Sequence, residues 1–119
     1  MKIIHLTYGK SIPKLKPFVL AIGFFDGLHL GHLSLVRKAK NYANEKNVAS
    51  ALMTFEPNPL IALGKMKEEH YLTSYQDRAE ILEKEAIDYL IIVEFSKEVS
   101  QLSPADFYNA FIQPFSIKG

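Results

Sequence analysis

The sequence predicts an α/β fold in which a parallel sheet carries helices on both faces. Short apolar runs alternate along the chain with segments of helical periodicity, which is typical of strand–crossover–strand units with right-handed connections. The runs at 18–24 and 88–95 are apolar almost throughout, as in strands that are buried on both faces. In such sheets, ligands bind beyond the carboxyl ends of the strands.

Each expected strand is an apolar run that ends at a turn or at a proline. The expected strands cover residues 2–6, 18–24, 48–55 and 88–95. The first run leads into Thr7-Tyr8-Gly9, and a polar loop with two prolines separates it from the second. Pro57 and Pro59 end the third, because proline lacks the backbone donor that a strand needs.

Three helices are expected, over residues 33–46, 75–84 and 104–112. The first has apolar residues at helical spacing with charged residues between them. Thr73 and Gln76 have capping-box spacing before the second. Ser103 followed by Pro104 is the typical start of a helix, with an N-cap and then a proline in the first turn.

Composition narrows the possible classes of protein. The chain has 119 residues, 48% of them hydrophobic and 23% charged, which fits one globular domain with a modest core. A net charge of +1 gives no basic field for nucleic acid. The sequence contains no cysteine, which excludes disulfides and fits a cytoplasmic location. No segment reads as a signal peptide or a membrane span, so no membrane partner is expected.

The most informative stretch is Gly-Phe-Phe-Asp-Gly-Leu-His-Leu-Gly-His at 23–32. It joins a buried strand to a helix, whose N-terminal amides and dipole favour anions. Gly27 and Gly31 permit a sharp turn and a close approach of backbone to a ligand. His29 and His32 are three residues apart, so both could donate hydrogen bonds to phosphate oxygens. The pattern predicts a phosphate-binding site suited to nucleotidyl transfer.

Other interpretations of these residues remain open. Two histidines at this spacing are often structural, and Asp26, His29 and His32 could instead bind zinc, although no fourth ligand is evident. Asp26 could also orient a histidine or hold magnesium through water. The stretch matches neither the Gly-x-x-x-x-Gly-Lys phosphate loop nor the Gly-x-Gly-x-x-Gly fingerprint. His5 and His70 are isolated and are predicted to be surface residues or residues with satisfied hydrogen bonds.

Four stretches together resemble a known family. The histidine stretch is similar to the His-x-Gly-His motif of the nucleotidyltransferase superfamily. Met-Thr-Phe-Glu-Pro-Asn-Pro at 53–59, Leu-Thr-Ser at 72–74 with Ile-Asp-Tyr-Leu at 87–90, and Leu-Ser-Pro at 102–104 narrow the match. They resemble the FMN adenylyltransferase module of bacterial FAD synthetases, with similarity over nearly the whole chain.

The resemblance implies a Rossmann-like fold and a reaction in which the phosphate of FMN attacks the α-phosphate of ATP. The substrates would be ATP and FMN with Mg2+, and the products FAD and pyrophosphate. The resemblance gives the catalytic role to His29 and His32, the nucleotide pocket to Gly23, Phe24, Phe25, Asp26, Gly31 and Thr54, and the neighbouring flavin or phosphate wall to Glu56, Pro57 and Asn58. It implies no metal bound by the protein's own residues.

The chain departs from the family pattern in two ways. Asn58 stands where the family often has histidine, and two later family segments and the riboflavin kinase domain lie beyond Gly119. We therefore expect residues 1–119 to be a single nucleotidyltransferase-like domain that is incomplete at its C-terminus, with residues 115–119 starting a further strand. Such a chain would bind nucleotide with little turnover and could self-associate through an exposed sheet edge. A cytidylyl- or other adenylyltransferase and a non-catalytic nucleotide-binding fragment remain alternatives.

Overall fold

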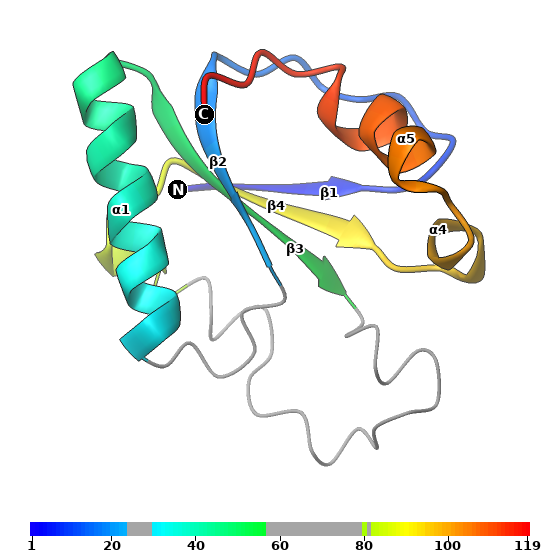
Figure 1. The fold of residues 1–119 in the computed structure, drawn as a ribbon, viewed down its shortest axis with the longest axis horizontal. Coiled ribbons are helices and arrows are strands. Elements are labelled where there is room, and N and C mark those ends of the chain that lie inside the picture. Colours follow the sequence, from blue (N-terminus) through cyan, green and yellow to red (C-terminus); the bar gives the residue numbers. More distant parts are fainter. Residues whose placement is uncertain (24–29, 57–79, 81) are drawn as a thin grey trace.

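The protein is built on a four-stranded parallel sheet (Figure 1). The computed structural model describes residues 1–23, 30–56, 80 and 82–119. The strands are β1 (Lys2–Leu6), β2 (Phe18–Ile22), β3 (Ala49–Glu56) and β4 (Tyr89–Glu94), in the order β1-β4-β3-β2. All three pairings are parallel, so the predicted parallel α/β sheet is confirmed.

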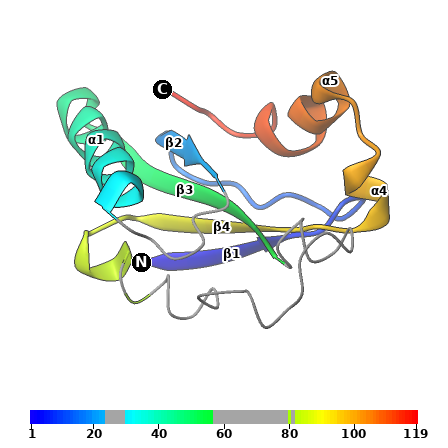
Figure 2. The ribbon, with the colours of Figure 1, turned by 60° about the horizontal axis from the view of Figure 1, so that its bottom comes forward.

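The described helices are α1 (Leu30–Lys46), α4 (Lys97–Ser100), α5 (Pro104–Phe107) and the π-helical turn η2 (Tyr108–Ile112), and residues 80 and 82–84 are helical as well. Figure 2 shows α4 just beyond the arrow end of β4, where the chain turns back toward α5. The rest of the helix expected over 75–84 lies outside the described residues.

The sequence placed some boundaries wrongly. Helix α1 begins at Leu30, three residues before the expected start, because the weak helix former Gly31 hides the first turn from a search for apolar periodicity. Helix α4 was not expected at all. It is a single turn started by Ser96, whose hydroxyl accepts a hydrogen bond from the Val99 amide at 3.2 Å. The helix expected over 104–112 changes from α-helical to π-helical geometry at Tyr108.

The end of the chain adds to the sheet beside β2. Ile117 forms a parallel bridge with Phe18. The Lys118 amide donates to the Phe18 carbonyl at 2.8 Å, and the Leu20 amide donates to the Gly119 carbonyl at 2.9 Å. The last residues therefore pair as a strand would, on the side of β2 opposite β3, as the sequence predicts for this segment.

Helices cover both faces of the sheet, as predicted. The face toward α1 buries Val19, Ala21, Leu52, Leu90 and Ile92 from the strands and Val36, Ala39 and Ala43 from the helix. The opposite face buries Ile4, Leu6, Phe18, Ala51, Met53, Ile91 and Val93 with Val99, Phe111 and Phe115. Neighbouring residues of β3 and β4 belong to different clusters, because successive side chains of a strand point to opposite faces.

Polar contacts join α1 to the amino ends of β3 and β4. One Asp88 carboxylate oxygen accepts from the Ser50 amide at 2.9 Å and from its hydroxyl at 3.2 Å, and Lys40 Nζ lies 3.6 Å from the same oxygen. Arg37 donates to both carboxylate oxygens of Glu85, at 3.0 and 2.9 Å. That hydrogen bonding holds the pKa of Glu85 below its usual value and raises the pKa of Arg37.

Candidate functional site at the carboxyl ends of the strands

The order of the strands reverses at β2. From β2 the chain adds β3 and then β4 on one side, and residues 116–119 return to pair on the other side of β2. Such a reversal opens a crevice beyond the carboxyl end of the strand where it occurs, and ligands of open α/β sheets bind there. The histidine stretch begins at this point, because Gly23 directly follows β2.

The described parts of the histidine stretch fit an anion site. The Gly23 amide donates to the Met53 carbonyl at 3.0 Å, which fixes the exit of β2 beside β3. Gly31 and His32 lie in the first turn of α1, a helix of 17 residues, where backbone amides have no partner within the helix. Those amides and the helix dipole favour a phosphate.

The structure describes only part of the site predicted from the sequence. Gly23, Thr54 and Glu56 are described in full, and Gly31 and His32 are placed as residues of α1. The remaining predicted site residues lie outside the described part of the chain: Phe24, Phe25, Asp26, His29, Pro57 and Asn58. Their roles, like those of the described residues, stay predictions.

The carboxyl half of β3 gives each of its residues a different environment. Thr54 is fully buried on the face toward α1. Phe55 faces the other way and packs against Phe107 and Phe95, with ring centroids 5.9 and 6.3 Å away, as expected for a core aromatic residue. Glu56 ends the strand, and its carbonyl accepts from the Phe95 amide at 3.1 Å. Of these three residues, Glu56 lies nearest the edge where ligands bind.

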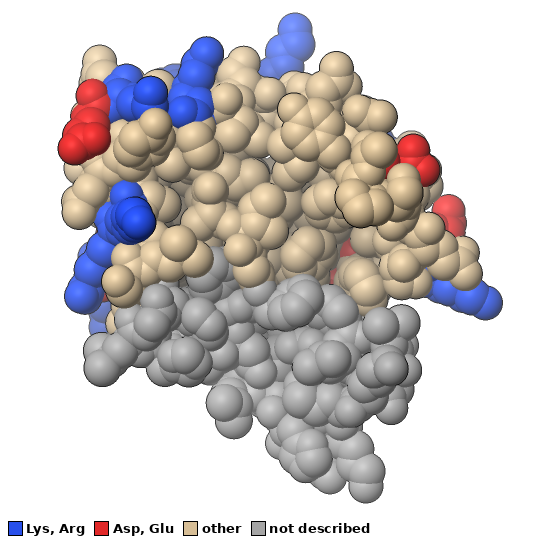
Figure 3. All heavy atoms as spheres, in the orientation of Figure 1, with Lys and Arg blue, Asp and Glu red and all other residues tan. Residues whose placement is uncertain are grey.

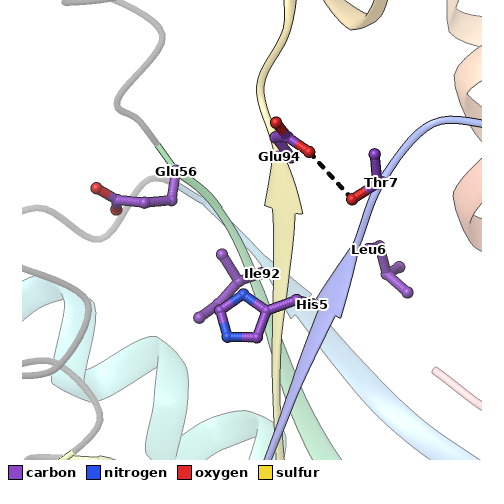
Figure 4. Close-up of a pocket in the computed structure, with 6 residues that line it drawn as sticks. All are labelled: His5, Leu6, Thr7, Glu56, Ile92 and Glu94. Carbon is purple, nitrogen blue, oxygen red and sulfur yellow. Dashed lines mark hydrogen bonds between the residues drawn. The ribbon is translucent and has the colours of Figure 1, made fainter.

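A hollow of about 210 Å³ opens at the carboxyl ends of β1, β4 and β3 (Figure 4). Its lining consists of His5, Leu6, Thr7, Glu56, Ile92 and Glu94. The Thr7 hydroxyl donates to Glu94 at 3.0 Å, and the His5 ring lies against Ile92. Glu56 and Glu94 are paired in the strand register, but their carboxylates lie apart in the figure, as expected for like charges.

Sequence reasoning missed the contribution of β1 and β4 to this edge. His5 was expected to be a surface or satisfied residue and is exposed, whereas Thr7 and Glu94 were not singled out. A polar residue at the carboxyl end of each predicted strand was the available signal. Among the described residues, no group of three histidine, aspartate or glutamate side chains could hold a metal ion. Within the same residues, no helix combines the length and apolarity of a bilayer span.

The fold and the edge geometry together define an α/β domain of the doubly wound class, with a helix N-terminus at the point where the strand order reverses. The model of one protein family, described as FAD synthetase, matches residues 11–118. The chain belongs to this FAD synthetase family.

Relatives with curated names agree with the family. The chain is 38% identical over 95 residues to a bifunctional riboflavin kinase/FMN adenylyltransferase of Listeria monocytogenes, covering 79% of this chain and 30% of the relative. It is 36% identical over 115 residues to the protein of the same name from Bacillus subtilis, covering 94% and 36%. A Listeria protein named FAD synthetase is 29% identical, with 90% and 43% covered. The chain thus spans about a third of the length of the bifunctional relatives.

A solved structure shares the fold. It is titled a macrolide-efflux protein from Streptococcus pneumoniae, and it matches with a TM-score of 0.84 and 28% identity. The match covers 99% of this chain and 46% of the other. This similarity supports the α/β architecture, whereas the functional argument depends on the family and on the site.

Proposed function

We propose that this chain forms the nucleotide-binding part of an FMN adenylyltransferase. In the reaction, a phosphate oxygen of FMN attacks the α-phosphorus of ATP. The bond from that phosphorus to the bridging oxygen of the β-phosphate breaks, and FAD and pyrophosphate result. The observation that carries the proposal is the position of the His-x-Gly-His stretch, which starts where the strand order reverses and ends in the first turn of α1.

The proposed roles follow from the charge that develops on the transferred group. His29 and His32 would donate hydrogen bonds to ATP phosphates and offset charge on the leaving pyrophosphate. Gly23 and Gly31, with Phe24, Phe25, Asp26 and Thr54, would shape the nucleotide pocket, and because Thr54 is fully buried its part would be to position the backbone around it. Glu56, Pro57 and Asn58 would form the flavin wall. No residue needs to bond covalently to the substrate, because alignment and electrostatics supply the catalysis.

Magnesium would arrive with the nucleotide. The described residues do not form a cage of three carboxylate or histidine ligands. Mg2+ commonly keeps several waters and binds through substrate phosphates with one or two protein carboxylates. We therefore treat MgATP as the substrate. The proposed cytoplasmic location depends only on the sequence, which has no cysteine.

Binding of MgATP tests the proposal. Calorimetric titration of the chain should detect MgATP, and His32→Ala should weaken binding about tenfold or more, because a hydrogen bond to a charged group is lost. His29→Ala should act similarly, whereas His70→Ala is the matched control and should leave affinity unchanged. No binding by the unsubstituted chain, or equal affinity in all three variants, would contradict the proposal.

A second candidate is another nucleotidyltransferase, favoured by the generic nature of the histidine motif. Titration with CTP, GTP and UTP separates the two, because a preference for CTP would point to cytidylyl transfer. The chain could also be a non-catalytic nucleotide-binding fragment, which FMN-dependent pyrophosphate release by these residues alone would refute.

Self-association is part of the same proposal. Strand β1 forms an edge of the described sheet, and Ile3 on that strand is 41% exposed. An exposed strand edge can pair with another chain. A monodisperse monomer in light scattering would argue against self-association.

A further inference from the structure

We propose that one side of α1 is a docking surface for an acidic amphipathic helix of a partner polypeptide. This surface, the α1 flank, consists of Leu35, Lys38, Tyr42 and Lys46 on the helix and of Lys118, which lines a hollow with Lys46. It includes none of the residues proposed to bind nucleotide, so the inference goes beyond the proposed function.

The two sides of α1 differ in what they contact. On one side, Arg37 and Lys40 form ion pairs with carboxylates of the segment that leads into β4. On the other side, Leu35 is 43% exposed and Tyr42 is 41% exposed. These two residues are seven positions apart, so they project from the same side of the helix. Exposed apolar residues at this spacing are typical of a helix that packs against a further element.

Lysines surround this apolar stripe. Among the described residues, Lys38, Lys46 and Lys118 form no ion pair, and Glu45 beside Lys46 in the sequence forms none either. Lys46 and Lys118 line a hollow of about 280 Å³ together with Val48. A partner that carries carboxylates would complement these positive charges, whereas a basic partner would be repelled.

Contacts on two sides hold the Tyr42 ring in place. Lys46 Nζ lies 5.1 Å from the centroid of this ring, in a cation–π contact. The ring also lies against Gly119, because it fills the space where a side chain at position 119 would begin. Figure 1 shows this end of the chain beside α1. An exposed aromatic residue with a fixed orientation loses little conformational entropy on binding, so Tyr42 is suited to anchor a partner.

The geometry of α1 favours a helix as the partner. An extended strand would need free backbone groups to pair with, and the side of a helix does not offer them. The i, i+7 spacing of Leu35 and Tyr42 instead matches the anchors of two helices that pack side by side. Lys46 ends α1 and lies beside Lys118, so an antiparallel helix would bring its acidic first turn to both lysines.

Fluorescence anisotropy with two labelled peptides tests the chemistry of the partner. Each peptide is an alanine-based helix of about 18 residues with leucines at i, i+3, i+4 and i+7. The two differ only in carrying glutamates or lysines beside the leucines. The acidic peptide should bind the full chain at least about tenfold more tightly than the basic one, and its affinity should fall as salt rises. Equal affinities for the two peptides would overturn the proposal.

Substitutions test whether the acidic peptide binds at the α1 flank. Tyr42→Ala should weaken binding about tenfold, because an anchor is lost. Tyr108→Ala is the matched control, since Tyr108 is 53% exposed on η2, which packs on the opposite face of the sheet. Lys118→Gln should weaken binding about threefold, as expected for an exposed charge pair, whereas the control Lys97→Gln on α4 should not. Unchanged affinity in Tyr42→Ala would overturn the proposal.

Thermal unfolding shows whether each variant keeps the fold. If Tyr42→Ala does not fold, Leu35→Ala takes its place with the same expected loss of peptide affinity. MgATP affinity should not change in Tyr42→Ala, so a failure to bind the peptide leaves the proposed function standing, and a failure to bind MgATP leaves this inference standing. Tighter binding of phosphatidylglycerol vesicles or of single-stranded RNA than of the acidic peptide would assign the lysines to a lipid or a nucleic acid and overturn the proposal.

Discussion

The two ends of the sheet differ in how their charges are arranged. At the amino ends, opposite charges meet: Asp88 accepts from Ser50 beside Lys40, and Arg37 pairs with Glu85. At the carboxyl ends, the like-charged Glu56 and Glu94 occupy paired positions of β3 and β4.

In Figure 3, the lysine and arginine atoms gather mainly over α1 and near the C-terminus. The first arrangement joins a helix to the sheet, whereas the second places like charges at neighbouring positions, where they repel each other. We infer that the amino ends serve stability and the carboxyl ends serve binding, a division that often accompanies function.

The largest effect is expected from Phe18, the first residue of β2. Phe18 is fully buried and meets Phe115 and Tyr89 edge-on, with ring centroids 5.5 and 5.9 Å away. Phe18→Ala should lower the free energy of unfolding by about 3–5 kcal/mol, because apolar area is lost and a cavity remains. Urea denaturation measures the loss, and Phe18→Leu should cost clearly less. If Phe18→Ala and Phe18→Leu lowered the free energy of unfolding equally, the packing of the Phe18 ring would not stabilise the amino end of the sheet.

Asp88→Ala should have the next largest effect. It removes the acceptor of the Ser50 amide and hydroxyl, and Ser50 is fully buried. A buried donor left without its partner costs about 1–3 kcal/mol, so the free energy of unfolding should fall by that amount. MgATP affinity should not change. Glu45→Ala on the exposed side of α1 is the control. A loss of affinity at unchanged stability would break the proposed division between the two ends.

Glu94→Gln tests the carboxyl ends of the strands through its effect on the free energy of unfolding. It relieves repulsion between paired carboxylates while keeping an acceptor for Thr7. The free energy of unfolding should stay the same or rise by up to about 0.5 kcal/mol. Chemical denaturation of Glu94→Gln and Asp88→Ala under the same conditions compares their free energies of unfolding directly. A destabilisation as large as that of Asp88→Ala would mean that the carboxyl end is also built for stability.

The smallest effect is a pH dependence at Glu85. Its pKa is lowered in the folded chain by the hydrogen bond from Arg37, so the folded state favours the ionised carboxylate. The stabilisation is present above the pKa of the unfolded chain and disappears as the pH falls through the lower folded value. Melting temperatures of the chain and of Glu85→Gln should differ at neutral pH and converge in acid. A constant difference would assign the effect to packing.

Sequence patterns located most elements because continuous apolar runs mark buried strands. All four strands were found, and their boundaries differ from the expected ones by two residues or fewer. Helix α4 was missed because a single turn set by one Ser96 cap carries no periodicity. The pairing of Thr7 with Glu94 was equally invisible, since the two residues are 87 positions apart and only the sheet brings them together.

The sequence by itself determined the class of fold, the family and the histidine stretch, because these depend on local patterns of residue type. Tertiary structure alone decided that β2 is where the strand order reverses, because that follows from residues 116–119 pairing on its far side. It also decided that β1 and β4 end beside Glu56, because register places residues that are distant in sequence along one edge of the sheet.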